Sequence, residues 1–408
     1  MIIQPLDPKT LGQRVQTERK ARGMTQSELA NLLGVARTTL TAVEKGERPL
    51  SSAEIMQLSK LWDISVTDLV RPRPIAEPLA PQLRAAVPQS GLTDDDIEDV
   101  AGVSEKMRQL GEYYLELEKL SGKPLPTVYP PVYTVSSMPI DDAAADIAAR
   151  ERNRLGLGEG PLPHLRSILE NDVGLRIFLL PMPSRIAGMF AYNAQLGGCI
   201  AINVAHPVER RLWTLAHEFY HFLCDRYSAD ICTLPGAAPR RLSENERLAD
   251  AFAAHFLMPE TGLRRRFYDL KAAKSDGVMP GDLLQLKRQY GVAFQALTLR
   301  LEELKLLRSG TWKYLREAGF HVREAEAMVG LPPRQDHEER MPLRYRLLAV
   351  EAYDRSAISE GQLKRFLDCD RTEARRIVND LSSELLISDE GSFGELDIMP
   401  GEPLAHIG

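Results

Sequence analysis

The segment 215–222 limits what this chain can fold into more than any other, because it carries an HExxH motif within an apolar run. On a helix, residues four positions apart project from one face, so His217 and His221 can bind a single metal ion. Glu218 lies one position round the helix, within reach of a water molecule at the same ion. The motif therefore predicts a zinc site that activates water, and with it hydrolysis of a peptide bond. A chance match on an amphipathic helix is the alternative interpretation.

A second helix is expected over 243–254, where Ser243 and Glu246 have the spacing of a capping box. Glu246 and Asp250 lie four residues apart and share one face of this helix. A catalytic zinc takes three protein ligands and keeps one position open for water. We therefore expect Glu246 to be the third ligand and Asp250 to hold a ligand imidazole in its metal-binding tautomer. Alternatively, Glu246 only caps the helix and Asp250 is solvated.

Zinc is the expected cofactor, because imidazole and carboxylate groups suit it, and manganese is a second candidate. His255, Cys224 and Cys232 are weaker candidate ligands. No two of the four cysteines have CxxC spacing, which argues against a structural zinc site.

Three stretches of this region resemble the ImmA/IrrE metallopeptidases, namely 200–203, 209–218 and 246–259. The resemblance covers roughly residues 150–310. In that family the two histidines and the later glutamate bind zinc, and the glutamate of HExxH is the general base. These roles map onto His217, His221, Glu246 and Glu218. The resemblance also implies a substrate class, because these peptidases typically make a limited cut in a transcriptional repressor, often of the helix-turn-helix type.

The length of 408 residues is too great for one small domain and suggests about three. No run approaches a membrane-spanning length, and the N-terminus lacks the basic and apolar regions of a signal peptide. Four scattered cysteines are typical of reduced thiols in a cytoplasm. The net charge is −6, but residues 1–73 carry 11 Lys and Arg against 8 Asp and Glu. We therefore expect a cytoplasmic protein with one small DNA-binding domain and no membrane contact.

Residues 11–70 are expected to form five short helices that include a helix-turn-helix. A capping box at 25–28 opens a helix that ends before Gly34, and a third helix should run from Ala36 to Lys45. These segments resemble Xre/Cro-type repressor domains. The second helix of a helix-turn-helix enters the major groove of double-stranded DNA by its N-terminal end. The expected operator contacts are Gln26, Arg37, Thr38, Thr39 and Thr41. A packing or protein-binding unit without DNA affinity is the alternative.

Five prolines between residues 71 and 92 predict an extended spacer, followed by a helix that begins near Thr93. Within that helix, apolar residues at steps of four and three form a heptad seam of Val103, Met107, Leu110, Tyr114 and Leu117. Two heptads leave two interpretations open. The seam either forms a homodimer coil, which two-fold operator binding favours, or packs on the peptidase body.

Strands are expected at 176–180, 189–192 and 198–203, after a helix over 143–154. An edge strand beside the metal-binding helix should pair with the substrate backbone. Two helix-turn-helix-like stretches follow, at 282–301 and from 359 to 381. The second contains Arg371, Arg375 and Arg376 among acidic neighbours that cancel most of their charge, so a scaffold or a surface that holds a protein substrate is expected there. A small wing or tail should follow from Ser388.

These features predict a mostly helical α+β protein. Its expected parts are a helix-turn-helix domain (1–71), a linker with an amphipathic helix (72–135), a zincin-like zinc metallopeptidase domain with a small sheet (136–310) and a helical or winged C-terminal region (311–408). We expect a DNA-binding transcriptional regulator that makes a zinc-dependent, limited cut in a repressor or other regulatory protein. Two alternatives stay open: a non-proteolytic transcription factor whose peptidase-like domain senses a ligand or only dimerises, and an autoprotease that cuts its own linker.

Overall fold

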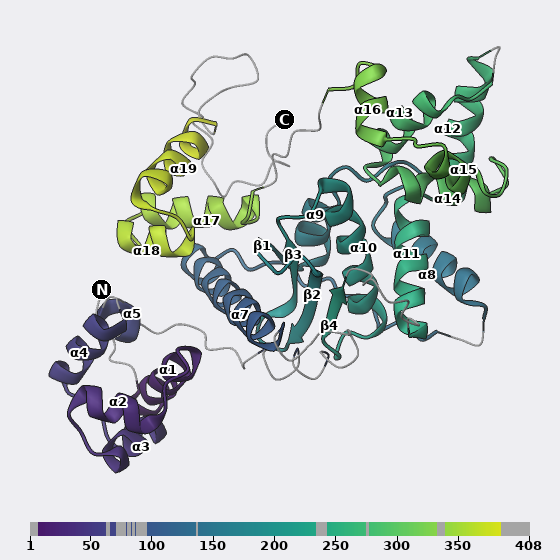
Figure 1. The fold of residues 1–408 in the computed structure, drawn as a ribbon. Helices are drawn as coiled ribbons and strands as arrows, with labels where there is room; N and C mark the ends of the chain where they lie inside the picture. Colours follow the sequence, from purple (N-terminus) through teal and green to yellow (C-terminus); the bar gives the residue numbers. More distant parts are fainter. Residues whose placement is uncertain are drawn as a thin grey trace, which may run out of the picture.

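The computed structural model describes residues 7–62, 66–70, 79, 83, 86, 96–135, 138–233, 243–274, 277–332 and 339–384. Helices dominate these residues and accompany one four-stranded sheet, so the predicted mostly helical α+β class is confirmed (Figure 1). Of the predicted proline-rich spacer only residues 79, 83 and 86 are described, and all three are buried in one of the hydrophobic cores, which contradicts an extended spacer at these positions. The expected helix start at Thr93 and the tail from Ser388 lie outside the described residues. None of the described helices combines the length and the apolar character that crossing a membrane would need.

The N-terminal part contains the five predicted helices, which stand apart from the rest of the chain in Figure 1. Thr25 caps the second helix with its hydroxyl, and Glu28 completes the predicted capping box. Gly34 ends that helix with a φ of 67°, in the left-handed region that glycine adopts without strain. Leu29, Leu40 and Leu58 lie at the centre of a small core that these helices share. The helices are α1 (Pro8–Ala21), α2 (Gln26–Leu33), α3 (Arg37–Lys45), α4 (Ser52–Trp62) and α5 (Val66–Val70).

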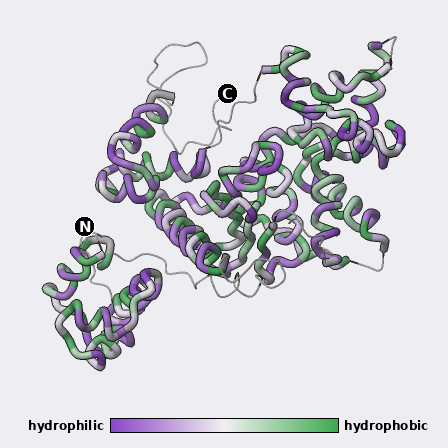
Figure 2. The backbone as a smooth tube through the Cα atoms, in the orientation of Figure 1, coloured by the Kyte–Doolittle hydropathy of each residue, from purple (hydrophilic) through white to green (hydrophobic). Residues whose placement is uncertain are grey.

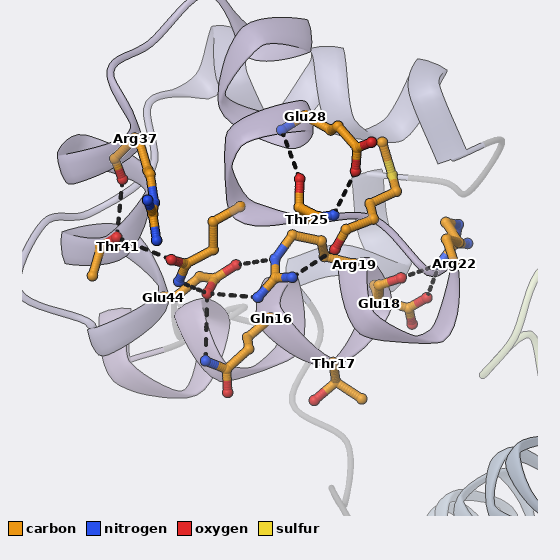
Figure 3. A network of polar contacts seen from close by, with 12 residues as sticks. Gln16, Thr17, Glu18, Arg19, Arg22, Thr25, Glu28, Arg37, Thr41 and Glu44 are labelled. Atoms are coloured by element: carbon orange, nitrogen blue, oxygen red, sulfur yellow. Dashed lines mark hydrogen bonds and ion pairs between the residues drawn. The ribbon is translucent and has the colours of Figure 1, made fainter. Parts of the chain in front are cut away.

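A buried ion pair fixes α3 against α1 and α2 (Figure 3). Arg19 of α1 donates to the Glu44 carboxylate of α3 at 2.6 Å, and Gln26 of α2 donates to the same carboxylate at 2.8 Å. Burial raises the pKa of Glu44, but the hydrogen bonds from Arg19 and Gln26 outweigh it and keep that pKa below its ordinary value. The charged form of Glu44 therefore holds three helices in one arrangement.

The sheet has the strand order β1-β3-β2-β4. The strands β1 (Arg176–Leu180), β2 (Ile186–Asn193) and β3 (Gly197–Asn203) confirm the three predicted ones, whereas β4 (Asp230–Thr233) follows the HExxH helix and was not predicted. β1 pairs parallel with β3, and β2 pairs antiparallel with both β3 and β4. β4 therefore forms one edge of the sheet.

Helices cover both faces of this sheet. Alternate residues of β1 face a core shared with α8 (Ile140–Arg154), α10 (Val208–Cys224) and α11 (Glu244–Leu257), which includes Ile177 and Leu179. The intervening residues, such as Phe178, face a second core shared with α7 (Asp96–Ser121). β1 therefore alternates between two buried faces, as the period of two in a strand requires.

The heptad seam of α7 packs on the body of the protein. Met107, Leu110, Tyr114 and Leu117 are fully buried in the core on the second face of the sheet, and Val103 packs at its border. Figure 2 shows hydrophilic and hydrophobic residues alternating along α7, as expected for a helix with one buried side. Of the two interpretations of this seam, the structure favours packing on the body over a homodimer coil.

The remaining helices continue both cores. Trp312 and Phe320 pack against Phe294 across the predicted domain boundary at residue 310, and Tyr345 packs edge-on against Tyr114 of α7. These elements are α9 (Leu165–Ile168), a π-helical turn η1 (Leu169–Val173), α12 (Glu260–Ala272), α13 (Pro280–Tyr290), α14 (Phe294–Glu303), α15 (Thr311–Glu317), α16 (Val322–Met328), α17 (Leu343–Asp354), α18 (Glu360–Phe366) and α19 (Arg371–Glu384).

The two helix-turn-helix-like stretches are present as the pairs α13–α14 and α18–α19. In the second pair, Arg371 and Arg375 bind the Glu360 carboxylate, and Arg376 binds Glu373. These ion pairs neutralise the three arginines, as the acidic neighbours in the sequence predict.

Candidate metal centre and nucleic-acid interface

The HExxH motif lies in α10, which begins after Pro207 and ends at Cys224. Apolar residues such as Phe219 and Phe222 bury this helix between the sheet and α11. His217 and His221 are both 2% exposed, and their Nε2 atoms lie 3.3 Å apart. Helical spacing thus brings the two nitrogens together, as predicted, at a distance that one metal ion can bridge.

Glu246 joins this pair from α11. The hydroxyl of Ser243 accepts a hydrogen bond from the Glu246 backbone amide at 3.2 Å, which caps the helix. The Glu246 carboxylate turns away from the cap and lies 3.5 Å from His217 Nε2 and 3.6 Å from His221 Nε2. The backbone of Glu246 therefore belongs to the cap, while its side chain takes the position expected of a third ligand.

Both imidazoles have a carboxylate behind them. Asp250 lies 3.1 Å from His217 Nδ1, as predicted, and also accepts a hydrogen bond from Trp213 at 3.4 Å. Asp225, which was not predicted, lies 3.8 Å from His221 Nδ1, an ion-pair distance too long for a hydrogen bond. A carboxylate that accepts the Nδ1 proton leaves the Nε2 lone pair for a metal. Burial raises the pKa of Asp250, but the hydrogen bond and charge of His217 lower it further, so the carboxylate stays ionised.

Asp230 of β4 is a fourth group at this centre. Its Oδ2 atom lies 3.5 Å from His221 Nε2. One ligand atom from each of His217, His221, Asp230 and Glu246 lies within 4.8 Å of the other three. No helical or motif spacing in the sequence connects Asp230 to the HExxH helix, because a turn and a strand pairing bring it there.

Glu218 lies beside these four groups and is completely buried. Apart from a weak contact with the Cys232 backbone amide, neither of its carboxylate oxygens has a hydrogen-bond partner among the described residues. Burial, and then the charge of Asp230, raise the pKa of Glu218 well above its ordinary value. A buried carboxylate of this kind is costly in a structural role, and it is typical of a functional group.

Gly188 of β2 makes the room for Glu218. A Cβ atom at this position would lie 2.9 Å from Glu218 Oε1 and 2.6 Å from Thr214 Cγ2. Both distances are shorter than van der Waals contact, so a larger residue would displace the Glu218 side chain or the strand. A single glycine in a strand gives little signal in a sequence, so Gly188 was not predicted as part of the site.

The donor set fits a tetrahedral metal ion. Bonds of about 2.0–2.2 Å to nitrogen and oxygen imply ligand atoms about 3.3–3.6 Å apart around a tetrahedron. The two histidine Nε2 atoms lie 3.3 Å apart. His217 Nε2 lies 3.5 Å from one Glu246 oxygen, and His221 Nε2 lies 3.6 Å from the other Glu246 oxygen and 3.5 Å from Asp230 Oδ2. Two imidazoles with carboxylates suit zinc, and manganese also accepts such ligands.

The weaker candidates lie elsewhere or beside the site. His255 forms a second cluster with Asp141 and Glu303. Its Nε2 atom lies 2.9 Å from Asp141, and its Nδ1 atom lies 2.8 Å from Arg300. Cys232 lies in β4 two residues after Asp230, and burial raises the pKa of its thiol to about 11.

The N-terminal end of α3 presents Arg37 and Thr38 to solvent, with Thr39 half-buried. Thr41 donates a hydrogen bond to the Arg37 carbonyl oxygen at 2.9 Å (Figure 3). Gln26 is bound to Glu44 and also accepts a hydrogen bond from Thr41 at 3.4 Å. Of the five predicted DNA contacts, Arg37 and Thr38 therefore have the most exposed side chains, while Gln26 and Thr41 also hold α2 and α3 together.

Comparison with known protein families gives two matches. Residues 15–69 match the family described as helix-turn-helix, and residues 170–302 match the IrrE N-terminal-like domain, a peptidase family. No curated protein matches the chain. Solved structures of ComR from Streptococcus suis and of the competence regulator ComR from Streptococcus vestibularis in its apo form are 13% and 14% identical. The matches cover 93% and 80% of this chain and 91% and 100% of the ComR chains. The TM-scores are 0.16 and 0.15, too low to indicate a shared fold.

Proposed function

Because this chain joins a helix-turn-helix domain to a domain of the IrrE N-terminal-like peptidase family, we propose that it is a transcriptional regulator whose second domain is a zinc-dependent endopeptidase. One observation carries the peptidase part. Two histidine Nε2 atoms and the Glu246 carboxylate converge at distances that suit a tetrahedral ion, and the buried Glu218 carboxylate, which no side chain hydrogen-bonds, belongs to the same helix turn. Manganese is the alternative metal.

A bound zinc ion would polarise the scissile carbonyl and lower the pKa of a water molecule. His217, His221 and Glu246 would hold the ion, and Asp250 would fix the His217 tautomer through Nδ1. Glu218 would take the proton of the attacking water and pass it to the leaving amine. The positive charge of an ion would counteract the burial that raises the Glu218 pKa, and so keep this carboxylate ready as a base.

We propose that the protein substrate is a transcriptional repressor or another regulatory protein, cut at a limited number of bonds. We further propose that β4, the edge strand beside the metal centre, pairs with the extended backbone of that substrate. The N-terminal domain would direct the protein to double-stranded operator DNA through α3, with Arg37, Thr38 and Thr39 toward the bases and Gln26 and Thr41 supporting them.

Glu218→Gln tests the peptidase. The variant should keep its metal and its operator affinity, because Glu218 is neither a proposed ligand nor part of the N-terminal domain. Cleavage of candidate repressors should fall by about 10²–10⁴-fold, measured by mass spectrometry of the fragments. Glu324→Gln, which changes an exposed glutamate of α16, is the matched control. A Glu218→Gln strain that regulates its target genes normally would refute proteolysis as the mechanism and favour a ligand-sensing transcription factor.

Arg37→Ala tests the DNA-binding part. If the guanidinium contacts a base, operator affinity should fall by about 1–3 kcal/mol, measured by fluorescence anisotropy at fixed salt. Lys60→Ala removes the same charge from an exposed position on α4 and should have a smaller effect. Unchanged binding in both Arg37→Ala and Thr38→Ala would mean that α3 does not contact the bases through these residues.

A further inference from the structure

We propose that Asp230 is a fourth protein ligand of the metal, so that the resting centre has a closed coordination shell. This inference rests on the metal centre proposed above and adds what holds it at rest. The three ligands expected from the sequence come from two helices, whereas Asp230 begins the four-residue edge strand β4. The fourth ligand therefore comes from a different and shorter element than the others.

The geometry places Asp230 on the metal side of His221. Its Oδ2 atom lies 3.5 Å from His221 Nε2, which matches the distances of 3.5 and 3.6 Å from Glu246 to the two histidines. Asp225 provides the contrast, because it faces the Nδ1 atom on the opposite side of the same ring, at 3.8 Å. The two aspartates therefore flank His221 in different roles, Asp230 toward the ion and Asp225 behind the ligand.

The surroundings of Asp230 also require a cation. Its Oδ2 atom is buried and makes no hydrogen bond to any residue that the structure describes. The Glu246 carboxylate is a second acid at the same centre, because its ligand atom and that of Asp230 lie within 4.8 Å of each other and of both imidazoles. Carboxylates packed this closely repel one another unless a positive charge lies between them. A divalent ion bound to both Asp230 and Glu246 provides that charge.

Four protein ligands give a closed site, whereas a catalytic zinc keeps one position open. Asp230 must therefore move away before substrate can reach the ion. Its strand is suited to such a shift, because among the described strands β4 pairs with β2 alone, and that pairing is irregular between Ile186 and Gly188. A substrate strand that pairs with the other side of β4 would therefore contact the strand that carries Asp230, the proposed fourth ligand.

Metal binding by the full-length protein tests this inference without any assay of cleavage. Zinc affinity is measured by competition with a chromophoric chelator. Asp230→Asn should weaken binding by more than about 100-fold, because changes behind a ligand typically cost about 10–100-fold. Asp225→Asn is the matched control, since it removes the same charge from the other side of His221. Circular dichroism and operator binding show whether each variant is folded.

Cobalt spectroscopy provides a direct readout of the bond. The substitution Asp230→Cys is made together with Cys232→Ser, which removes the neighbouring thiol. The Co²⁺-loaded double variant should show a near-ultraviolet sulfur-to-cobalt charge-transfer band that Cys232→Ser alone lacks. Absence of this band, together with an Asp230→Asn affinity no lower than that of Asp225→Asn, would overturn the fourth ligand and leave the three-ligand centre intact. A wild-type protein that binds neither Co²⁺ nor Zn²⁺ would refute the metal centre itself.

Discussion

Among the residues that the structure describes, two clusters bring histidine and carboxylates together at metal-binding distances, and one of them has the properties of a metal site. In the cluster around His255, Arg300 can only donate, so it donates to Nδ1 of the ring, and Nε2 then donates to Asp141. Arg300 also binds Glu303 at 2.6 Å. An arginine already provides the positive charge in this cluster, and both ring nitrogens of His255 have protein partners.

The cluster around His217 and His221 differs in what it leaves unsatisfied. Its histidine Nε2 atoms face one another and two carboxylates, and the described part of the chain brings no lysine or arginine into an ion pair with Glu246 or Asp230. It is also more enclosed, because its two histidines are buried and the Glu246 and Asp230 side chains are 24% and 20% exposed, whereas the Asp141 and Glu303 side chains are 61% and 46% exposed. Residue types therefore do not distinguish a metal site from a structural cluster of histidine and carboxylates. Buried acceptors without a protein donor do distinguish the two.

The proposed difference between the two histidine clusters is wrong if both of them bind metal. His221→Ala should reduce zinc affinity by more than about 100-fold, since it removes a ligand and not a group behind one. His255→Ala should leave both affinity and stoichiometry unchanged, because Arg300 occupies that cluster. Titration with zinc against a chelator checks both variants. Equal losses in the two would mean that the His255 cluster also binds metal.

A second feature of the His217 cluster is the space beside Glu218 that Gly188 leaves open. Gly188→Ala should displace this carboxylate, and a misplacement of about 1 Å can cost about 10²-fold in rate. Overpacking should also lower the free energy of unfolding by about 1–3 kcal/mol. Gly102→Ala in α7 is the control, because a Cβ atom there meets nothing within 4 Å. Cleavage at the wild-type rate by Gly188→Ala would show that the close contact does not position Glu218.

The two histidine–aspartate pairs allow a closer comparison, because the distances between their ring nitrogen and carboxylate oxygen are nearly equal. Asp250 lies 3.1 Å from His217, and Asp141 lies 2.9 Å from His255. Asp250→Asn should weaken zinc binding by about 10–100-fold, because the carboxylate supports a ligand. Asp141→Asn should not change zinc binding. Isothermal titration of both variants compares them directly, and an equal response would remove the distinction between the pairs.

The smallest effect is expected at Glu303. Glu303→Gln breaks an ion pair whose acid is 46% exposed, so the free energy of unfolding should change by about 0–1 kcal/mol, measured by urea denaturation. Metal content should stay the same. A loss of bound zinc in this variant would contradict the assignment of the His255 cluster as a structural one.

The part of the site that follows helical spacing could be predicted from the sequence. His217, Glu218 and His221 share one turn of α10, and Glu246 and Asp250 share one face of α11, so a period of 3.6 residues places each set. Asp230 and Gly188 could not be predicted, because strand pairing brings β4 and β2 to the helix and no local pattern records that pairing. Which residues bind metal or DNA stays a prediction until the variants above are measured.

The same difference holds for the fold: local sequence patterns predict individual helices and strands, but not the contacts between residues that lie far apart in the chain. Capping boxes, glycines and apolar periodicity predict the five N-terminal helices and three of the strands. The heptad seam of α7 is compatible both with a homodimer coil and with packing on the body of the protein. Its actual partners, such as Tyr345, lie more than 200 residues away in the sequence. A seam of this kind cannot identify its partner, because apolar packing is not directional.

The placement of α17 on the far face of the sheet has a consequence for synthesis on the ribosome. Roughly 160 residues separate β1 from α17 along the chain, which at about 5–20 residues per second corresponds to about 8–30 s of translation. During that time the N-terminal helices already have their complete core and can fold, whereas Phe178 and its neighbours on the sheet still lack Tyr345. The DNA-binding domain of a nascent chain should therefore be folded before the peptidase domain is, and chaperones that recognise exposed apolar strands should bind in this interval.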